Sequence, residues 1–215
     1  MVVRRAKMIR NTISTYQLFN LFPDEPTARE YVEGRLWPNG PICPTCKSGG
    51  RITARANGGF KRCNACKFDF TVRTGTIFGR SHIPLHKWLY AMYLLVTARK
   101  GISSIQLAKE VGITQKSAWF VLHRLREACG GVGSGEVQRA PVSPDNTGSF
   151  YAVMKRGLYG VYHRPSAKHM PRYVNEFTFR LNDGDVKHHT LEQLDSFVDA
   201  VVGKRITYKD LTAPG

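Results

Sequence analysis

Hydrophobic residues in the middle of the chain recur every three or four positions, which is the spacing of an amphipathic helix. This pattern predicts a helix from Leu85 to about Arg99 and two further helices, Ser104–Val111 and Gln115–Cys129. Ser103 precedes the second helix as a suitable N-cap, and Gly112 separates the second helix from the third. Three helices with a glycine-containing turn between the last two indicate a helix-turn-helix.

Helical spacing also occurs towards both ends of the chain. Tyr16–Phe22 and Ala28–Leu36 read as two short helices, with Asp24 as a plausible N-cap between them. After a glycine-rich and polar stretch at 130–148, three more segments have apolar residues at helical spacing: Phe150–Leu158, Pro171–Leu181 and Leu191–Val202.

Between the first two and the middle three helices the pattern changes from helical spacing to alternation. Arg51–Thr53 and Phe60–Arg62 flank Asn57-Gly58-Gly59, a strong hairpin signal. Phe68–Val72 then alternates apolar and polar positions, as a half-buried third strand would. This region is therefore predicted to be a small β-domain.

Four cysteines lie within the predicted β-domain in the order Cys43-x2-Cys46-x16-Cys63-x2-Cys66. Each Cys-x2-Cys pair can form a tight turn that directs two thiolates at one point, and two such turns close a tetrahedral S4 shell. The spacing predicts a zinc ribbon with a structural Zn²⁺. Cys129, on a predicted helix, is expected to be an ordinary buried thiol.

Two disulfides or an S4 iron centre are the alternatives for these four cysteines. Disulfides need an oxidising compartment, and the N-terminus leads into no apolar run of the kind a signal peptide requires, so we expect a cytoplasmic protein. Six basic side chains around the ligands favour a polyanionic partner over electron transfer: Lys47, Arg51, Arg55, Lys61, Arg62 and Lys67.

The net charge of the chain is +16, and it is unevenly distributed. Residues 1–129 carry 21 basic and 7 acidic side chains, whereas residues 130–215 carry 11 and 9. A strongly basic half indicates binding to nucleic acid. A membrane is a weaker candidate partner, because no segment approaches the roughly 18 to 20 apolar residues of a span and no long basic amphipathic helix is evident.

The helix-turn-helix supplies the predicted DNA contacts, because the leading end of its second helix is the part that meets base edges. Thr114, Gln115, Lys116 and Ser117 occupy that end. Other basic side chains are expected to hold phosphates without reading sequence: Lys61, Arg62, Lys87, Arg124, Arg126, Lys155, Arg156, Lys168 and Arg172. The alternative is a three-helix packing domain with a polar exposed face.

Longer strings of sequence resemble a bacterial insertion-sequence transposase family. They include Thr12–Phe19, the ribbon, Thr74–Phe78 leading to Ile83–Trp88, Lys155–His163 and Gly203–Leu211. The resemblance implies an N-terminal zinc ribbon and helix-turn-helix joined to a ribonuclease-H-like domain, whose acidic triad binds Mg²⁺. It also implies double-stranded DNA as partner, in particular the terminal inverted repeats of the element, and self-association or association with a parent transposase.

The catalytic middle expected from the resemblance is missing. Only eleven residues, 138–148, separate Val137, which would open the first catalytic strand, from Ser149. A single βαβ unit needs about 30 residues. Gly148 stands where the family places its third acid, and Glu136 and Asp145 match no catalytic position. We therefore expect no Mg²⁺ site and no strand cleavage or transfer, since that chemistry needs metals clamped by several carboxylates.

The sequence thus predicts an α+β protein: an N-terminal helical segment (1–37), a zinc ribbon (38–80), a helix-turn-helix (81–129), a junction (130–148) and a helical remnant of a ribonuclease-H-like domain (149–215). Its expected function is that of a catalytically silent DNA-binding protein. The alternatives are an active transposase whose core is supplied by another chain, a zinc-ribbon transcriptional regulator, and a pseudogene product whose C-terminal half does not fold.

Overall fold

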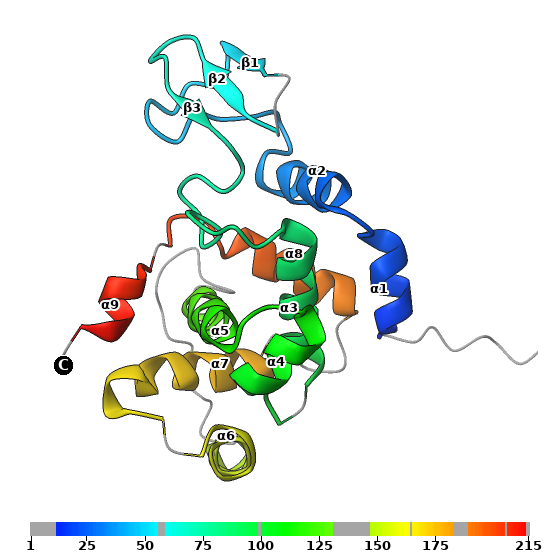
Figure 1. Ribbon diagram of the computed structural model, residues 1–215, viewed down its shortest axis with the longest axis vertical. Coiled ribbons are helices and arrows are strands. Elements are labelled where there is room, and N and C mark those ends of the chain that lie inside the picture. The colour runs from blue at the N-terminus through cyan, green and yellow to red at the C-terminus, as the bar shows by residue number, and fades with distance from the viewer. Residues whose placement is uncertain are drawn as a thin grey trace, which may run out of the picture.

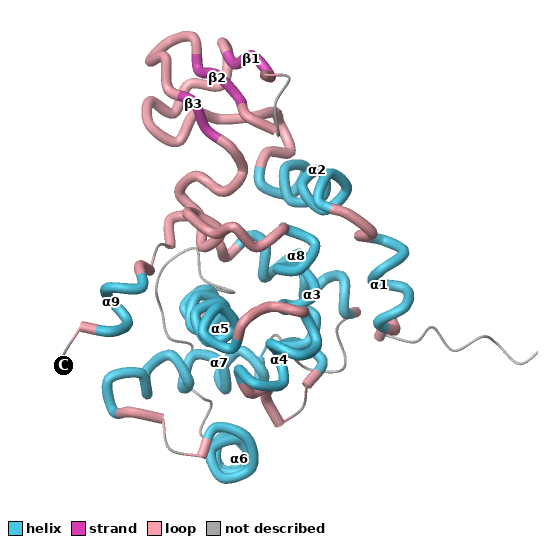
Figure 2. The backbone as a smooth tube through the Cα atoms, viewed as in Figure 1, coloured by secondary structure: helices cyan, strands magenta, loops and turns pink. Residues whose placement is uncertain are grey.

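The computed structural model describes residues 12–55, 59–98, 100–130, 147–163, 165–182, 189–204 and 206–213. A body of helices carries a small three-stranded sheet at one end, and helix α2 lies between the sheet and the body (Figure 1). Three short strands are embedded in long loops (Figure 2). The predicted α+β class is confirmed.

The N-terminal helices begin at side-chain caps. In α1 (Thr15–Leu21), Ser14 and Gln17 form a reciprocal capping box. In α2 (Glu25–Leu36), the Asp24 carboxylate accepts a hydrogen bond from the backbone N–H of Thr27 at 2.9 Å, as predicted. The helix begins three residues earlier than expected because proline is well suited to the first turn.

The sheet is antiparallel with the order β1-β2-β3 (Ile52–Ala54, Lys61–Cys63 and Asp69–Phe70). Ile52 pairs with Cys63, and Lys61 pairs with Phe70. Phe70 is buried and meets Trp37 edge-on, with ring centroids 5.8 Å apart. The predicted hairpin glycine Gly58 lies outside the described residues.

The predicted helix-turn-helix is present as α3 (Leu85–Thr97), α4 (Ser104–Val111) and α5 (Gln115–Cys129). The bounds of α4 and α5 are those predicted from the sequence. Ser103 caps α4 by accepting from the Gln106 N–H at 3.1 Å, and Gly112 ends it in the left-handed conformation with φ 65°. The inward faces of these helices form the centre of the main core.

The C-terminal part is helical: α6 (Thr147–Gly157), a π-helical turn η2 (Leu158–Tyr162), a 3-10 turn η3 (Ala167–His169), α7 (Met170–Asn182), α8 (Thr190–Asp199) and α9 (Tyr208–Thr212). Helix α7 packs on α5, and α8 packs on both α2 and α3. Phe179, Leu194, Phe197, Val198 and Val201 are buried in the same core as the helix-turn-helix. The C-terminal segment is therefore folded against the N-terminal half, although the predicted domain boundaries stay predictions.

Polar contacts also hold the C-terminal helices against the N-terminal half. The Tyr31 hydroxyl donates to Asp195 at 2.5 Å, and Arg35 forms a bidentate salt bridge with Asp199, with N–O distances of 2.8 and 3.0 Å. Thr76 forms an isolated antiparallel bridge with Val202. Segments more than a hundred residues apart in the sequence are thus held together by side-chain and backbone bonds.

A buried ion pair lies deeper in the same interface. Glu176 accepts from Arg126 at 2.7 Å, from Arg180 at 2.7 Å and from the Tyr162 hydroxyl at 2.5 Å. Burial alone would raise the pKa of Glu176, but Arg126 and Arg180 outweigh it and lower that pKa well below its usual range. Glu176 is thus completely buried and paired, and Arg126, which the sequence predicts to hold a phosphate, is fully occupied here and does not face solvent.

Candidate metal centre and nucleic-acid interface

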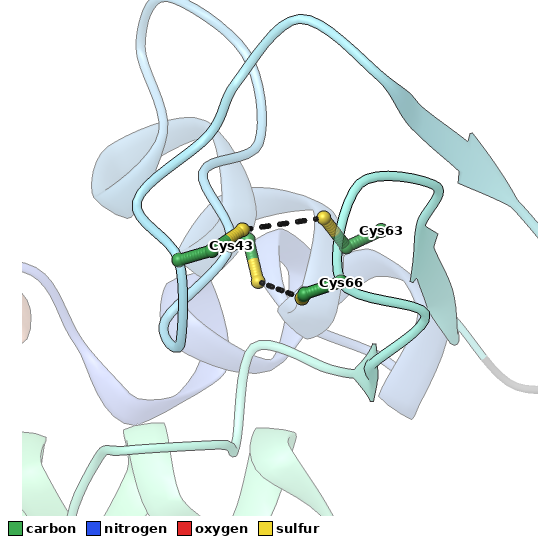
Figure 3. Close-up of side chains that lie close together, drawn as sticks. Cys43, Cys63 and Cys66 are labelled. Atoms are coloured by element: carbon green, nitrogen blue, oxygen red, sulfur yellow. Dashed lines mark hydrogen bonds between the residues drawn. The ribbon is translucent and has the colours of Figure 1, made fainter.

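The four cysteine sulfurs converge between two loops of the sheet domain. All four lie within 4.8 Å of one another. The Sγ atoms of Cys43 and Cys66 are 3.6 Å apart, and those of Cys46 and Cys63 are 3.5 Å apart (Figure 3). Separations of this size suit four thiolates bound to one ion at about 2.3 Å, the usual zinc–sulfur distance. The spacing-based prediction of one shared centre is therefore confirmed.

The two metal-binding loops share the same backbone hydrogen bond and the same backbone conformation. In the first, the N–H of Cys43 donates to the carbonyl of Ser48 at 3.0 Å, and in the second the N–H of Cys63 donates to the carbonyl of Phe68 at 2.9 Å. The residue after each second cysteine, Lys47 or Lys67, adopts a left-handed backbone with φ near 60°. That conformation is uncommon for residues with a side chain, so both loops fold tightly at the position where two ligands must converge.

The backbone N–H groups of the loops favour the thiolate at two of the four cysteines, Cys43 and Cys63. Burial raises the pKa of Cys43, but the backbone N–H groups of Cys46 and Thr45 outweigh it and lower the pKa to about 6. The backbone N–H of Cys66 likewise lowers the pKa of Cys63. At Cys66 the backbone N–H of Phe68 lowers the pKa, but burial and hydrogen bonds with the other three sulfurs outweigh it and raise that pKa to about 12. Zinc binds the deprotonated sulfur, so this donor set fits zinc.

Within the part of the chain that the structure describes, these cysteines are the one group of three or more His, Cys, Asp or Glu side chains close enough to share a metal ion. Cys129 is buried elsewhere, in the helical core, and burial raises the pKa of its thiol. The expectation that Cys129 is an ordinary buried thiol is confirmed. Glu136 and Asp145 lie outside the described residues.

The leading end of α5 is exposed and polar. Thr114 caps the helix by accepting from the Ser117 N–H at 3.2 Å. Gln115 and Lys116 are exposed, and the Gln115 side-chain amide donates to the Ser104 hydroxyl at 2.9 Å across the helix-turn-helix. Lys87 donates to the carbonyl of Gly112 at 3.2 Å, beside the turn. These five side chains, predicted to contact DNA, are brought together at one end of the motif.

The remaining predicted DNA contacts are spread over the molecule. Lys155 and Arg156 are exposed on α6, and Lys168 donates to the carbonyl of Ala213. Three others form ion pairs: Lys61 with Glu33 at 2.7 Å, Arg62 with Asp69 at 2.9 Å and Arg172 with Glu127 at 3.1 Å. These residues do not form one cluster with the leading end of α5.

Arg124 occupies a position unlike the one expected of a phosphate contact. Its side chain is buried, it donates to the carbonyls of Ile77 and Gly79 at 2.6 and 2.8 Å, and its guanidinium lies 4.2 Å from the centroid of the Phe120 ring. The guanidinium joins α5 to the segment after the ribbon, so it is not part of the candidate DNA interface.

Sequence reasoning missed one neighbour of the interface. The Lys116 ammonium lies over the ring of Tyr208, 4.8 Å from its centroid, and the ring of Phe120 is 6.1 Å from the same tyrosine. Helix α9 therefore sits beside the leading end of α5. A tyrosine in a five-residue helix near the chain end carries no signal of this contact in its local pattern.

None of the helices in the described ranges is long and apolar enough to cross a lipid bilayer.

Comparison with known families gives two matches. Residues 23–68 match the transposase zinc-ribbon domain, and residues 132–182 match the ISXO2-like transposase domain. With the sulfur geometry above, the first match identifies the cysteine cluster as a structural zinc site.

One curated relative is an uncharacterized protein in transposable element ISH50 of Halobacterium salinarum, 30% identical over 109 residues. The aligned region is 50% of this chain and 36% of the relative, so the chain spans little more than a third of the relative's length. No solved structure matches.

Proposed function

We propose that this chain, whose zinc ribbon and ISXO2-like segment are those of insertion-sequence transposases, binds double-stranded DNA without cutting it. The observation that carries the proposal is the exposed polar end of α5, with Gln115 and Lys116 free of the core. A helix-turn-helix presents this end to the edges of bases in the major groove. The DNA we expect is the terminal inverted repeats of its own element.

Charge supports a polyanionic partner. Residues 1–129, which hold both the ribbon and the helix-turn-helix, carry a net charge of +14 out of the +16 of the whole chain. Lys87 is held beside the turn by the Gly112 carbonyl, where it can meet a phosphate flanking the groove. Exposed Lys155 and Arg156 extend the basic surface on α6.

The role of the zinc ion in the proposed function is structural. Bound by Cys43, Cys46, Cys63 and Cys66, it supplies four metal–sulfur bonds in place of a core that so short a segment lacks. The ribbon is joined to the body through Trp37 and Phe70, and through the Lys61–Glu33 pair on α2. Zinc binding thus sets the position of the basic ribbon relative to the helices.

We further propose that the chain is catalytically silent. Eleven residues between Val137 and Ser149 are too few for the strands that would carry acidic metal ligands. Glu176, the acid of the C-terminal core, is committed to two arginines and a tyrosine. Strand cleavage needs two metals about 4 Å apart, clamped by several carboxylates.

The test is to titrate zinc-loaded protein against a mixed-sequence duplex over a range of salt concentrations and to follow anisotropy. We expect log affinity to fall linearly with log salt, with a slope near −0.9 per phosphate neutralised. The same mixtures, incubated with Mg²⁺ or Mn²⁺ on supercoiled plasmid, should yield no nicked product. Salt-independent binding would contradict the DNA proposal, and metal-dependent nicking that survives repurification would contradict catalytic silence.

A further inference from the structure

A cavity of about 380 Å³ lies between the helix-turn-helix and the C-terminal helices, and it plays no part in the zinc site. Its walls come from α4 and α5 on one side and from η2, η3 and α7 on the other. Cavities that bind small molecules have volumes of roughly 300 to 1,000 Å³.

Aromatic and imidazole rings form part of the cavity wall. The Trp119 ring lies 4.4 Å from His123 and 5.7 Å from His169, centroid to centroid. The rings of Tyr162 and Tyr173 meet edge-on, with centroids 4.9 Å apart. Aromatic walls of this kind hold planar ligands by stacking.

His123 is the unexplained polar group of this cavity. Its side chain is completely buried, yet neither Nδ1 nor Nε2 has a hydrogen-bond partner among the described residues. Leaving buried polar atoms unpaired costs about 1–3 kcal/mol, so such atoms are rare in native structures. Burial and the nearby Arg126 lower the pKa of His123 to about 3, so its ring is neutral and offers one donor and one acceptor.

Among the described residues, the lining of the cavity offers no free charge to a ligand. Arg126, the charged residue of its lining, is paired with Glu176 at 2.7 Å and lies under the rings of Tyr162 and Tyr173. A phosphate or a carboxylate would find no uncommitted cation among the described lining residues. The preferred ligand is therefore neutral, planar and able to both donate and accept hydrogen bonds along one edge.

The geometry points to a nucleobase as the ligand of this cavity. Flat stacking surfaces with a donor and an acceptor facing the base edge are how proteins hold a base taken out of the helical stack. The cavity also lies close to the proposed DNA-binding end of α5. Ser103 and Ser104, at the start of α4, line the cavity, and the Ser104 hydroxyl accepts a hydrogen bond from Gln115 at the leading end of α5. We infer that DNA bound at the helix-turn-helix extrudes a base into this cavity; this part rests on the proposed DNA binding.

The first test uses the full zinc-loaded chain and free nucleosides in calorimetry. Nucleoside binding that is lost in His123→Phe, which keeps ring volume but removes both nitrogens, supports the site. The second test compares a mixed-sequence duplex carrying one unpaired adenine with the same duplex fully paired. We expect at least a tenfold preference for the unpaired base, because extrusion then costs no base pair.

Variants separate the cavity from general DNA binding. Ser166→Trp, which fills the cavity from an exposed lining position, and His123→Phe should each reduce the preference below threefold while leaving affinity for the paired duplex unchanged. Tyr151→Ala, at an exposed aromatic on α6 outside the lining, should keep the full preference. Circular dichroism should show that each variant is folded.

The outcomes assign the source of the base. Nucleoside binding without a preference for the unpaired duplex would assign the cavity to free nucleosides. A wild-type chain that binds neither nucleosides nor the unpaired base preferentially, or a preference that persists in both cavity variants, would overturn the inference. Failure to bind the paired duplex would contradict the proposed function instead, and the nucleoside arm would still report on the cavity.

Discussion

At the residue scale, the zinc ligands and the buried ion pair are the side chains on which the fold depends most. Three of the four cysteines lie in loops and Cys63 ends strand β2, so their positions rely on the two tight backbone turns and on the metal. Glu176 is equally central in the helical body, where three side chains donate to it.

Replacing one zinc ligand should release the metal. Cys63→Ser is expected to lose zinc and to unfold the ribbon, because three thiolates do not close the shell around the ion. Cys129→Ser is the matched control, since Cys129 lies outside the cluster and should leave one zinc per chain. Zinc content measured by atomic absorption checks both variants, and full zinc retention in Cys63→Ser would contradict the assignment.

Neutralising Glu176 should destabilise the protein by about 3–5 kcal/mol, because Glu176→Gln leaves a buried Arg126 without its counter-ion. The control is Glu30→Gln on the exposed side of α2, expected within about 0.5 kcal/mol of wild type. Urea unfolding measures both.

The effect of Glu176 on stability should depend on pH in one direction. Because the pKa of Glu176 is lowered in the folded state, its stabilising contribution is complete above the unfolded pKa, about 4.3. It is lost as the pH falls towards the folded pKa. The difference between wild type and Glu176→Gln should therefore shrink below about pH 4, and a difference that grows on acidification would contradict the ion-pair account.

At the element scale, the two helices of the helix-turn-helix could be predicted to the residue, whereas their neighbours could not. Ser103, Gly112 and Thr114 are local signals for helix ends, and such signals act over a few residues. What covers a helix is set by distant residues. Arg124 and Arg126 are buried by segments that are distant in the sequence, and local periodicity does not predict this burial. For that reason the sequence alone predicts both arginines to be phosphate contacts.

Helix α9 should restrict the movement of the side chain of Lys116, the lysine proposed to read a base. Tyr208→Ala removes the ring beneath the Lys116 ammonium, a contact worth about 0.5–1 kcal/mol at an exposed site. DNA affinity is expected to rise roughly two- to fivefold, which is the same free energy expressed as a ratio. Tyr16→Ala, at an exposed tyrosine on α1, is the control. Unchanged or weaker binding by Tyr208→Ala in anisotropy titrations would show that α9 does not restrain Lys116.

At the scale of the whole molecule, the sequence correctly predicts the fold class, the zinc site and the helix-turn-helix, because these depend on local spacing. It does not predict that the C-terminal helices complete the core of the N-terminal half. The apolar stripe of α8 predicts only that Leu194, Phe197 and Val198 are buried. Their partners on α2 and α3 lie about a hundred residues or more away in the sequence.

This shared core makes a prediction about truncation. Residues 1–129 carry the helix-turn-helix and most of the excess charge, and alone they would resemble a self-sufficient DNA-binding unit. Removing residues 190–215, however, strips Phe197 and Val198 from α3 and breaks the Arg35–Asp199 pair. The truncated chain is expected to lose cooperative thermal unfolding. A cooperative transition at the wild-type temperature would contradict the shared core.

This chain, which matches transposase domains over residues 23–68 and 132–182, is proposed to read specific DNA through the end of α5. The most direct measurement is to sequence DNA recovered with the protein from its own cells, for wild type and for Gln115→Ala and Lys116→Ala. The account predicts enrichment of one recurring sequence at the ends of an insertion element, lost in both variants, each of which should forfeit roughly 1–3 kcal/mol of discrimination. Recovery of DNA without any shared sequence, or the same enrichment in all three proteins, would contradict it.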